Sequence, residues 1–176
     1  MHVRRVIAGV SGSAGSLQAL RYAAEMARSE GAVLAPVLAW TPPGGDLADR
    51  RAPCPPLRRA WTQAAWDRLW QAIDLGIGGP PADIAFSPHI GRGGAGEVLS
   101  QLAVEPGDVL VIGAGRRGAI RRLTTCAVSR YCLGHAACPV IAVPPARLAL
   151  EATGLHGWRL RHRLQTGDAD LHAADA

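Results

Sequence analysis

Five short apolar runs recur along the chain, separated by segments with helical spacing. The runs are continuous rather than alternating, which is typical of strands buried on both faces of a parallel sheet. The predicted strands cover residues 4–10, 33–40, 83–90, 108–113 and 140–143. Because strands and helices alternate, the pattern predicts an α/β fold with a doubly wound, five-stranded parallel sheet.

Apolar stripes predict the helices between these strands. In the first helix Leu17, Leu20, Ala24 and Ala27 share one face, and Gly31 is placed to end the helix. The second helix is predicted over 57–75, with an apolar face formed by Trp61, Ala65, Leu69, Ala72 and Ile73, and broadened by Trp66 and Trp70. Aromatic residues at helical spacing are more typical of a core than of a base-stacking platform. Shorter helices are predicted over 97–103 and after the fourth strand.

Two features interrupt this pattern. Pro36 lies inside the second strand and has no N–H for a ladder, so we expect the pairing to begin after it or to contain a bulge. Residues 41–56 are rich in proline and glycine, and we expect them to be structureless. A segment of this length is typical of a mobile connection, or of a lid or partner-binding loop.

The chain of 176 residues is long enough for one α/β domain and a short appendage. We assign residues 1–147 to the domain and 148–176 to a tail that is flexible or forms a short helix. The tail is basic and apolar over Trp158–Leu164 and then turns acidic, which does not favour a nucleic-acid-binding arm.

Neither a membrane span nor a secretion signal is recognisable in the sequence. No apolar run reaches the ~20 residues of a spanning helix, and the N-terminus enters a strand pattern without a small-residue cleavage site. We therefore expect a cytoplasmic protein. The four cysteines do not resemble a disulfide framework, so free thiols are expected.

Three cysteines and a histidine lie close together in the sequence, which raises the question of a metal site. Cys126 and Cys132 would be roughly 120° apart on a helix of 3.6 residues per turn. Cys138 lies at the entry to a buried strand, so no metal site is expected from this group, which also includes His135. Cys132 is better explained as a small core residue.

The formal net charge is +5, and all nineteen basic residues are arginine. Because these arginines are spread through every segment, a coding bias explains them better than selection for anion binding. The absence of lysine excludes a Walker-type phosphate site and Schiff-base chemistry.

The loop after the first strand approaches a serine-hydrolase motif. Gly9-Val10-Ser11-Gly12-Ser13 contains the first glycine and the serine of a nucleophile elbow but lacks its last glycine. Since the sequence shows no base–nucleophile pair, we do not expect an enzyme.

The fourth strand runs into a glycine loop at residues 113–118. Such a loop can offer backbone N–H groups to an anion, and Gly113, Gly115 and Gly118 have the spacing of a dinucleotide fingerprint. However, the following strand ends in Val143-Pro144-Pro145, without an acidic residue for a ribose hydroxyl, which argues against NAD. Nearby arginines could bind phosphate or form a solvated charge run; they are Arg116, Arg117, Arg121 and Arg122.

Three stretches together carry a family resemblance. They are Val6–Ser13 with Ser16 and Ala19-Leu20, the run Asp108–Gly113, and Ala136–Val143. Over about 145 residues the chain resembles the universal stress protein family. The resemblance implies a flavodoxin-like sheet of order 3-2-1-4-5 and a homodimer through the last strand, Val140–Val143. In one branch it also implies ATP held between the ends of the first and fourth strands, but no catalytic chemistry.

The sequence departs from the ATP-binding members of that family. Those members have an aspartate where this chain has Ser11, and a later motif of three glycines and a hydroxyl residue. Gly113 falls on the first glycine, Arg116 on the second, Cys126 on the third and Ala127 on the hydroxyl residue. Cys126 and Ala127 would each weaken binding by about 1 kcal/mol, through a side chain at a close approach and a lost donor.

Two hypotheses follow from the resemblance. The first is a stress-response regulator that binds ATP or another adenine nucleotide, with no metal held by protein ligands. Its candidate nucleotide-binding residues are Val10, Ser11, Ala39, Gly113, Gly115, Arg116, Gly118, Cys126, Ala127 and Val128. The second is a dimeric interaction module of the same fold that binds no nucleotide and acts on an unknown protein partner.

Overall fold

The computed structural model describes residues 2–114 and 122–144, without the side chains of residues 122–126. Its elements are β1 (Arg5–Gly9), α1 (Ala14–Glu30), β2 (Val33–Trp40), α2 (Gly45–Arg51), α3 (Pro55–Ile77), β3 (His89–Arg92), α4 (Ala95–Leu102), β4 (Asp108–Gly113), α5 (Arg122–His135) and β5 (Val140–Val143). The predicted tail lies outside the described residues, and so does the predicted domain boundary at residue 147. Most of the glycine loop lies outside them too.

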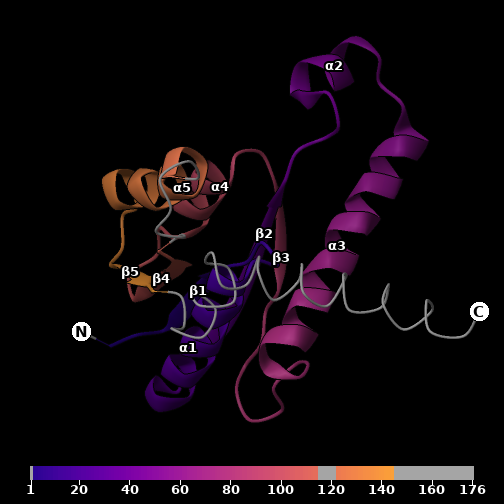
Figure 1. Ribbon diagram of the computed structural model, residues 1–176. Helices are drawn as coiled ribbons and strands as arrows, with labels where there is room; N and C mark the ends of the chain where they lie inside the picture. Colours follow the sequence, from indigo (N-terminus) through magenta and orange to yellow (C-terminus); the bar gives the residue numbers. More distant parts are fainter. Residues whose placement is uncertain (1, 115–121, 145–176) are drawn as a thin grey trace, which may run out of the picture. The chain divides into compact units, whose positions relative to one another are not determined.

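The five strands form one sheet in the order β3-β2-β1-β4-β5, and every pair of neighbours is parallel. This confirms the predicted fold class and strand order. Helices α1 and α3 cover one face of the sheet, while α4 and α5 cover the other (Figure 1). In such a fold, ligands bind beyond the carboxyl ends of the strands, where the winding reverses between β1 and β4.

The core is divided by the sheet into two apolar clusters. Val6 and Ala8 point toward α1 and α3, whereas Ile7 packs with the cluster under α4 and α5. Because successive side chains of a strand point to opposite faces, a strand covered on both faces must be apolar throughout. Cys132 is fully buried in the second cluster, as predicted for a small core residue.

Both ends of α1 follow from its sequence. Ser13 has an extended backbone, and its hydroxyl accepts a hydrogen bond from the Ser16 N–H at 3.3 Å. Gly31 ends the helix with φ of 63°, a left-handed conformation that glycine adopts without cost. The predicted end of the helix at Gly31 is confirmed.

The prediction for Pro36 is wrong in detail. β2 pairs with β1 through Pro36, which is opposite Ala8, and the register contains no bulge. The interruption lies on the β3 side, where Leu34 bridges Phe86 and Val37 pairs with His89. Since one offset relates both pairs, Pro36 lies opposite Pro88.

The same interruption shortens the third strand. The predicted strand over 83–90 is wrong in its bounds, because regular pairing begins at His89 and runs to Arg92. Before it, the segment pairs with β2 at the isolated Leu34–Phe86 bridge. The next donor on this side of β2 would be the N–H that Pro36 lacks, so the ladder is interrupted there.

The segment 41–56 is not structureless as predicted, because it contains α2. α3 then begins earlier than expected, with Pro55 in its first turn, where the lack of an N–H costs nothing. The buried face of α3 includes Ala65, Leu69 and Ala72, as predicted. Trp70 is 38% exposed and its ring lies 6.2 Å from that of Phe86, so it borders the core rather than filling it.

Candidate functional site

The carboxyl ends of β1 and β4 lie side by side at the centre of the sheet. The two strands pair in parallel, with Ala8 opposite Val111. Gly113, at the end of β4, approaches the first turn of α1 so closely that a β-carbon on it would lie 2.8 Å from the Gly15 carbonyl. The predicted neighbourhood of the β1 loop and Gly113 is therefore present in the structure.

Three serine hydroxyls gather in the loop between β1 and α1. The hydroxyl of Ser11 lies 3.1 Å from that of Ser13 and 3.2 Å from that of Ser16. The Ser16 hydroxyl also accepts a hydrogen bond from the Ser11 N–H at 3.1 Å and donates to the Ser13 carbonyl at 2.9 Å. Ser11 and Ser13 are exposed, whereas Ser16 is buried. The cluster thus presents two accessible hydroxyl groups at the start of α1.

The remaining candidate residues differ in position. Val10 is buried, and its N–H donates to the Val37 carbonyl at 2.8 Å. Ala39 is half-buried near the carboxyl end of β2, opposite Gly91 of β3. Val128 packs against the core beneath α4 and α5, and Ala127 is exposed. Gly115, Arg116 and Gly118 lie outside the described residues, as does the side chain of Cys126.

Ser129 is a neighbour of this region that sequence reasoning missed. Its hydroxyl donates to the Gly113 carbonyl at 3.2 Å, and the residue is 9% exposed. The family motif places its hydroxyl residue at position 127, where alanine stands, so the motif carries no signal for position 129. Ser129 thus ties α5 to the end of β4.

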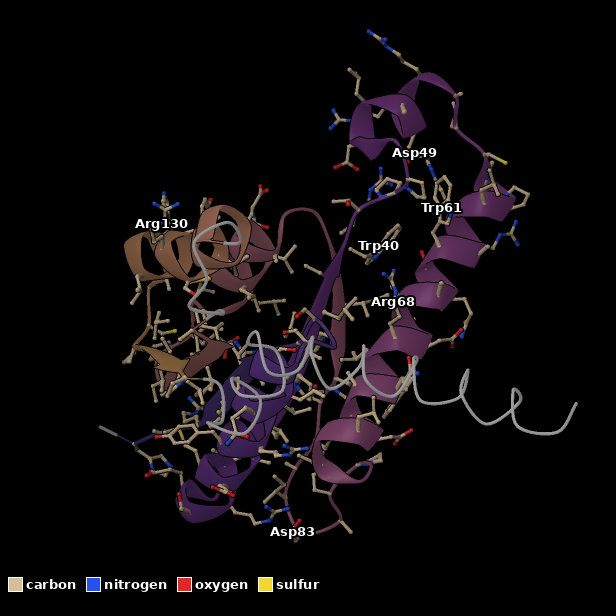
Figure 2. The ribbon with its side chains drawn as sticks, viewed as in Figure 1. Trp40, Asp49, Trp61, Arg68, Asp83 and Arg130 are labelled. Carbon is tan, nitrogen blue, oxygen red and sulfur yellow. The ribbon has the colours of Figure 1, made fainter. Side chains whose placement is uncertain are left out.

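A second polar cluster lies beyond the carboxyl ends of β2 and β3. Asp49 of α2 is held by Arg58 of α3 and Arg92 of β3, and Arg92 also pairs with Asp46. The Arg92 guanidinium carbon lies 6.0 Å from the centroid of the Trp40 ring. Figure 2 shows Asp49 where α2 approaches the start of α3, and Trp40 between β2 and α3.

Electrostatics at this cluster favour the ionised carboxylate. The hydrogen bond from Arg58, followed by that from Arg92, lowers the pKa of Asp49, although burial acts in the opposite direction. The hydrogen bonds to Asp46 and then to Asp49 raise the pKa of Arg92. No local sequence pattern indicates this network, since Arg92 lies 43 positions from Asp49.

An ion pair of a different kind lies at the opposite, amino end of the sheet. Arg5 donates to both carboxylate oxygens of Asp108, at 2.9 and 2.7 Å, and to the Leu102 carbonyl at 2.9 Å. Asp108 is buried and also accepts from the Glu105 N–H. Because ligands of this fold bind at the carboxyl edge, we assign this pair to stability.

No group of three or more potential metal ligands is found within residues 2–114 and the described side chains up to Pro144. Cys54, Cys132 and Cys138 are free thiols, in agreement with the prediction for the described cysteines. In the same part of the chain, no helix combines the length and the apolar character that crossing a membrane requires.

A comparison with models of protein families shows which family this chain belongs to. The model of the universal stress protein family matches residues 2–144. The chain belongs to the universal stress protein family. The match covers every described element of this family member, including the serine loop and the end of β4. A comparison with curated proteins gave no match.

Solved structures of the same family share the fold of this member. A universal stress protein in complex with cAMP is 22% identical to this chain, with a TM-score of 0.54. The match covers 83% of this chain and 100% of that protein's chain. UspA from Lactobacillus plantarum is 17% identical, with a TM-score of 0.54, and the match covers 81% of this chain and 99% of the UspA chain. A universal stress protein from Archaeoglobus fulgidus is 20% identical, with coverages of 81% and 99% and a TM-score of 0.55.

Proposed function

We propose that this universal stress protein binds ATP or a related adenine nucleotide at the carboxyl ends of β1 and β4, as a cytoplasmic stress-response regulator without catalytic turnover. The observation that carries the proposal is the close approach of Gly113 to the first turn of α1, beside the accessible hydroxyls of Ser11 and Ser13. One solved relative of the same fold is described in complex with cAMP.

The local electrostatics support an anionic ligand. α1 has no acidic residue in its first turn, so the positive end of its dipole is not neutralised there. Backbone N–H groups at a helix start and serine hydroxyls are donors suited to phosphate oxygens. Ser11 replaces the carboxylate that the ATP-binding branch uses, so it can donate or accept a hydrogen bond without adding negative charge near the phosphates.

Equilibrium binding of ATP, ADP, AMP and cAMP to the purified full chain tests the proposal. We expect saturable binding of at least one nucleotide, and about fivefold weaker binding in Ser11→Ala, because one hydrogen bond is lost. Ser29→Ala is the matched control, since its exposed hydroxyl donates to the Met26 carbonyl in the last turns of α1, at the far end of the helix from the serine loop. Absence of saturation at millimolar nucleotide, or equal affinity in Ser11→Ala, would contradict the proposed site.

The rival function is a dimeric interaction module that binds no nucleotide. It is favoured by a specific observation: the hydroxyls of Ser11, Ser13 and Ser16 bond one another, and Gly113 is required for packing without any ligand. In this case the homodimer would form through β5, which in the described part of the chain pairs on one side only, with β4. A dimer without nucleotide binding would support this rival.

A further inference from the structure

Helix α2 is attached to the domain by charge rather than by apolar packing. Its only buried residue is Asp49, while its one large apolar side chain, Leu47, is 61% exposed. Short helices in globular proteins are normally held by an apolar face packed against the core. The attachment of α2 therefore depends on what binds the carboxylate of Asp49.

Two guanidinium groups bind that carboxylate. The Arg58 Nε lies 2.9 Å from each oxygen of Asp49, and the Arg92 Nη2 donates to one of them at 2.8 Å. The Asp49 side chain is 1% exposed, whereas those of Arg58 and Arg92 remain 40% and 35% exposed. The two arginines come from α3 and β3, so a single carboxylate joins three elements.

The connection before α2 is suited to a hinge. Gly44 precedes the helix and Gly45 is its first residue, and both have positive φ, of 82° and 81°. Only glycine adopts this region freely, and two such residues in succession leave the backbone free to rotate. On the other side the helix ends at Arg51, and Pro53-Cys54-Pro55 leads into α3.

We propose that α2 is a releasable strap, and that the guanidiniums of Arg58 and Arg92 form an oxyanion-binding site when the Asp49 carboxylate leaves them. In the closed state Asp49 is an internal ligand of this site. The inference is independent of nucleotide binding at Ser11 and Gly113, since it concerns different elements. Its ligand class is a phosphate or another small oxyanion.

The chemistry of the closed state supports this ligand class. Arginine binds carboxylate and phosphate oxygens through the same forked donors, so a group that holds Asp49 can hold a phosphate. Arg58 lies in the first turns of α3, a helix with no acidic residue in its first turn, where the helix dipole also favours an anion. The Arg92 guanidinium also lies over the Trp40 ring of β2, a contact that does not depend on α2.

The charged groups around Asp49 determine how release of α2 changes the charge at the two arginines. Arg58 and Arg92 face it from α3 and β3, and Asp46 of the same helix shares Arg92. Release of α2 removes both carboxylates from the two arginines at once. The open state therefore has two unneutralised guanidiniums, which an oxyanion stabilises by mass action.

Hydrogen–deuterium exchange of the full chain tests the strap. We expect Asp49→Asn to lower the protection of the amides in residues 45–52 by about tenfold or more, because the charged anchor is lost. Protection of β1 and β4 is expected to stay unchanged, which shows that the domain remains folded. Asp83→Asn is the matched control, because it removes the exposed ion pair with Arg28 and changes the net charge equally. Unchanged protection of 45–52, or an equal loss throughout the domain, would overturn the proposal.

Calorimetric titration with pyrophosphate at constant ionic strength tests the oxyanion site. We expect Asp49→Asn to bind pyrophosphate about tenfold more tightly than the wild type, because the internal carboxylate no longer competes. Adding Arg92→Gln should abolish this gain, whereas adding Ser11→Ala should preserve it. Equal affinity of the wild type and Asp49→Asn, a gain that survives Arg92→Gln, or a gain lost in Ser11→Ala would each overturn the site.

Discussion

A β-carbon on Gly113 would lie 2.8 Å from both the carbonyl carbon and the carbonyl oxygen of Gly15. The neighbouring atoms belong to the backbone of α1, which cannot move aside as a flexible side chain can. We predict that Gly113→Ala lowers the free energy of unfolding by about 2 kcal/mol through overpacking. Urea denaturation measures the change.

Gly134→Ala is the control for that substitution. A β-carbon at Gly134, near the end of α5, would meet no atom within 4 Å. Alanine is a better helix former than glycine, so this variant should be as stable as the wild type or slightly more stable. Equal denaturation midpoints for Gly113→Ala and the wild type would show that β4 does not press on α1.

The Arg5–Asp108 pair supports a prediction about buried charge. Arg5→Gln leaves the carboxylate of Asp108, which is 2% exposed, without its charged partner. Breaking a buried ion pair from one side typically costs about 3 kcal/mol or more, so the free energy of unfolding should fall by this amount. In the exposed Arg28–Asp83 pair, Arg28→Gln should change stability little. Equal losses in the two variants, measured by thermal and urea denaturation, would contradict this assignment.

The lowered pKa of Asp49 predicts how the strap responds to acid. Hydrogen bonds from Arg58 and then from Arg92 cause the shift. A carboxylate with a lowered pKa in the folded state contributes its full stabilisation above the unfolded value, about 3.9. That contribution is lost as the pH falls through the folded value.

Protection factors of residues 45–52 should therefore be constant between about pH 7 and 5, and should fall once the pH drops below about 4. Protection factors, rather than raw exchange rates, remove the intrinsic effect of pH on exchange. Asp49→Asn should show low protection without this acid step. A step of the same size in Asp49→Asn would assign it to another group.

The outer edge of β5, which pairs with no other strand within residues 2–114 and 122–144, offers a selective test of the proposed homodimer. The Val143 carbonyl accepts from Ala114 N–H on the β4 side, so the alternate residue Ala142 directs its N–H outward. Ala142→Pro removes this outward donor and leaves the β4–β5 hydrogen bonds in place. We predict that it converts dimer to monomer in light scattering, whereas Ala142→Val, which keeps the donor, remains dimeric. A dimeric proline variant would exclude pairing through this edge.

The regular part of the fold was predictable because it depends on local patterns. The continuous apolar runs of β1, β4 and β5, and the helical spacing that ends at Gly31, specify elements without knowledge of their neighbours. For the segment 41–56 the local pattern was misleading, because its glycines and prolines are typical of loops and indicated no helix. Within it α2 is held by Arg58 and Arg92, which lie outside the segment, and the pattern of residues 41–56 does not contain that information.

The candidate site was predictable only in part. The pairing of β1 with β4 follows from the fold, so the proximity of the serine loop and Gly113 could be expected. The reason that position 113 requires glycine could not be expected, because it depends on how closely the backbones of β4 and α1 pack together. Likewise, Ser129 binds the Gly113 carbonyl across 16 positions, a contact that depends on how α5 docks. The assignment of the ten candidate nucleotide-binding residues stays a prediction.

Pro36 removes one hydrogen bond from the outermost seam of the sheet, between β2 and β3. Leu34 exchanges hydrogen bonds with Ala85 and Ser87, so the next donor on this side of β2 would be the N–H that Pro36 lacks, and regular pairing resumes with Val37 opposite His89. Opening of the β2–β3 pairing that starts at Arg92 is expected to reach as far as Pro36. We therefore expect the end of β3 that carries Arg92 to open at a lower free-energy cost than the central strands.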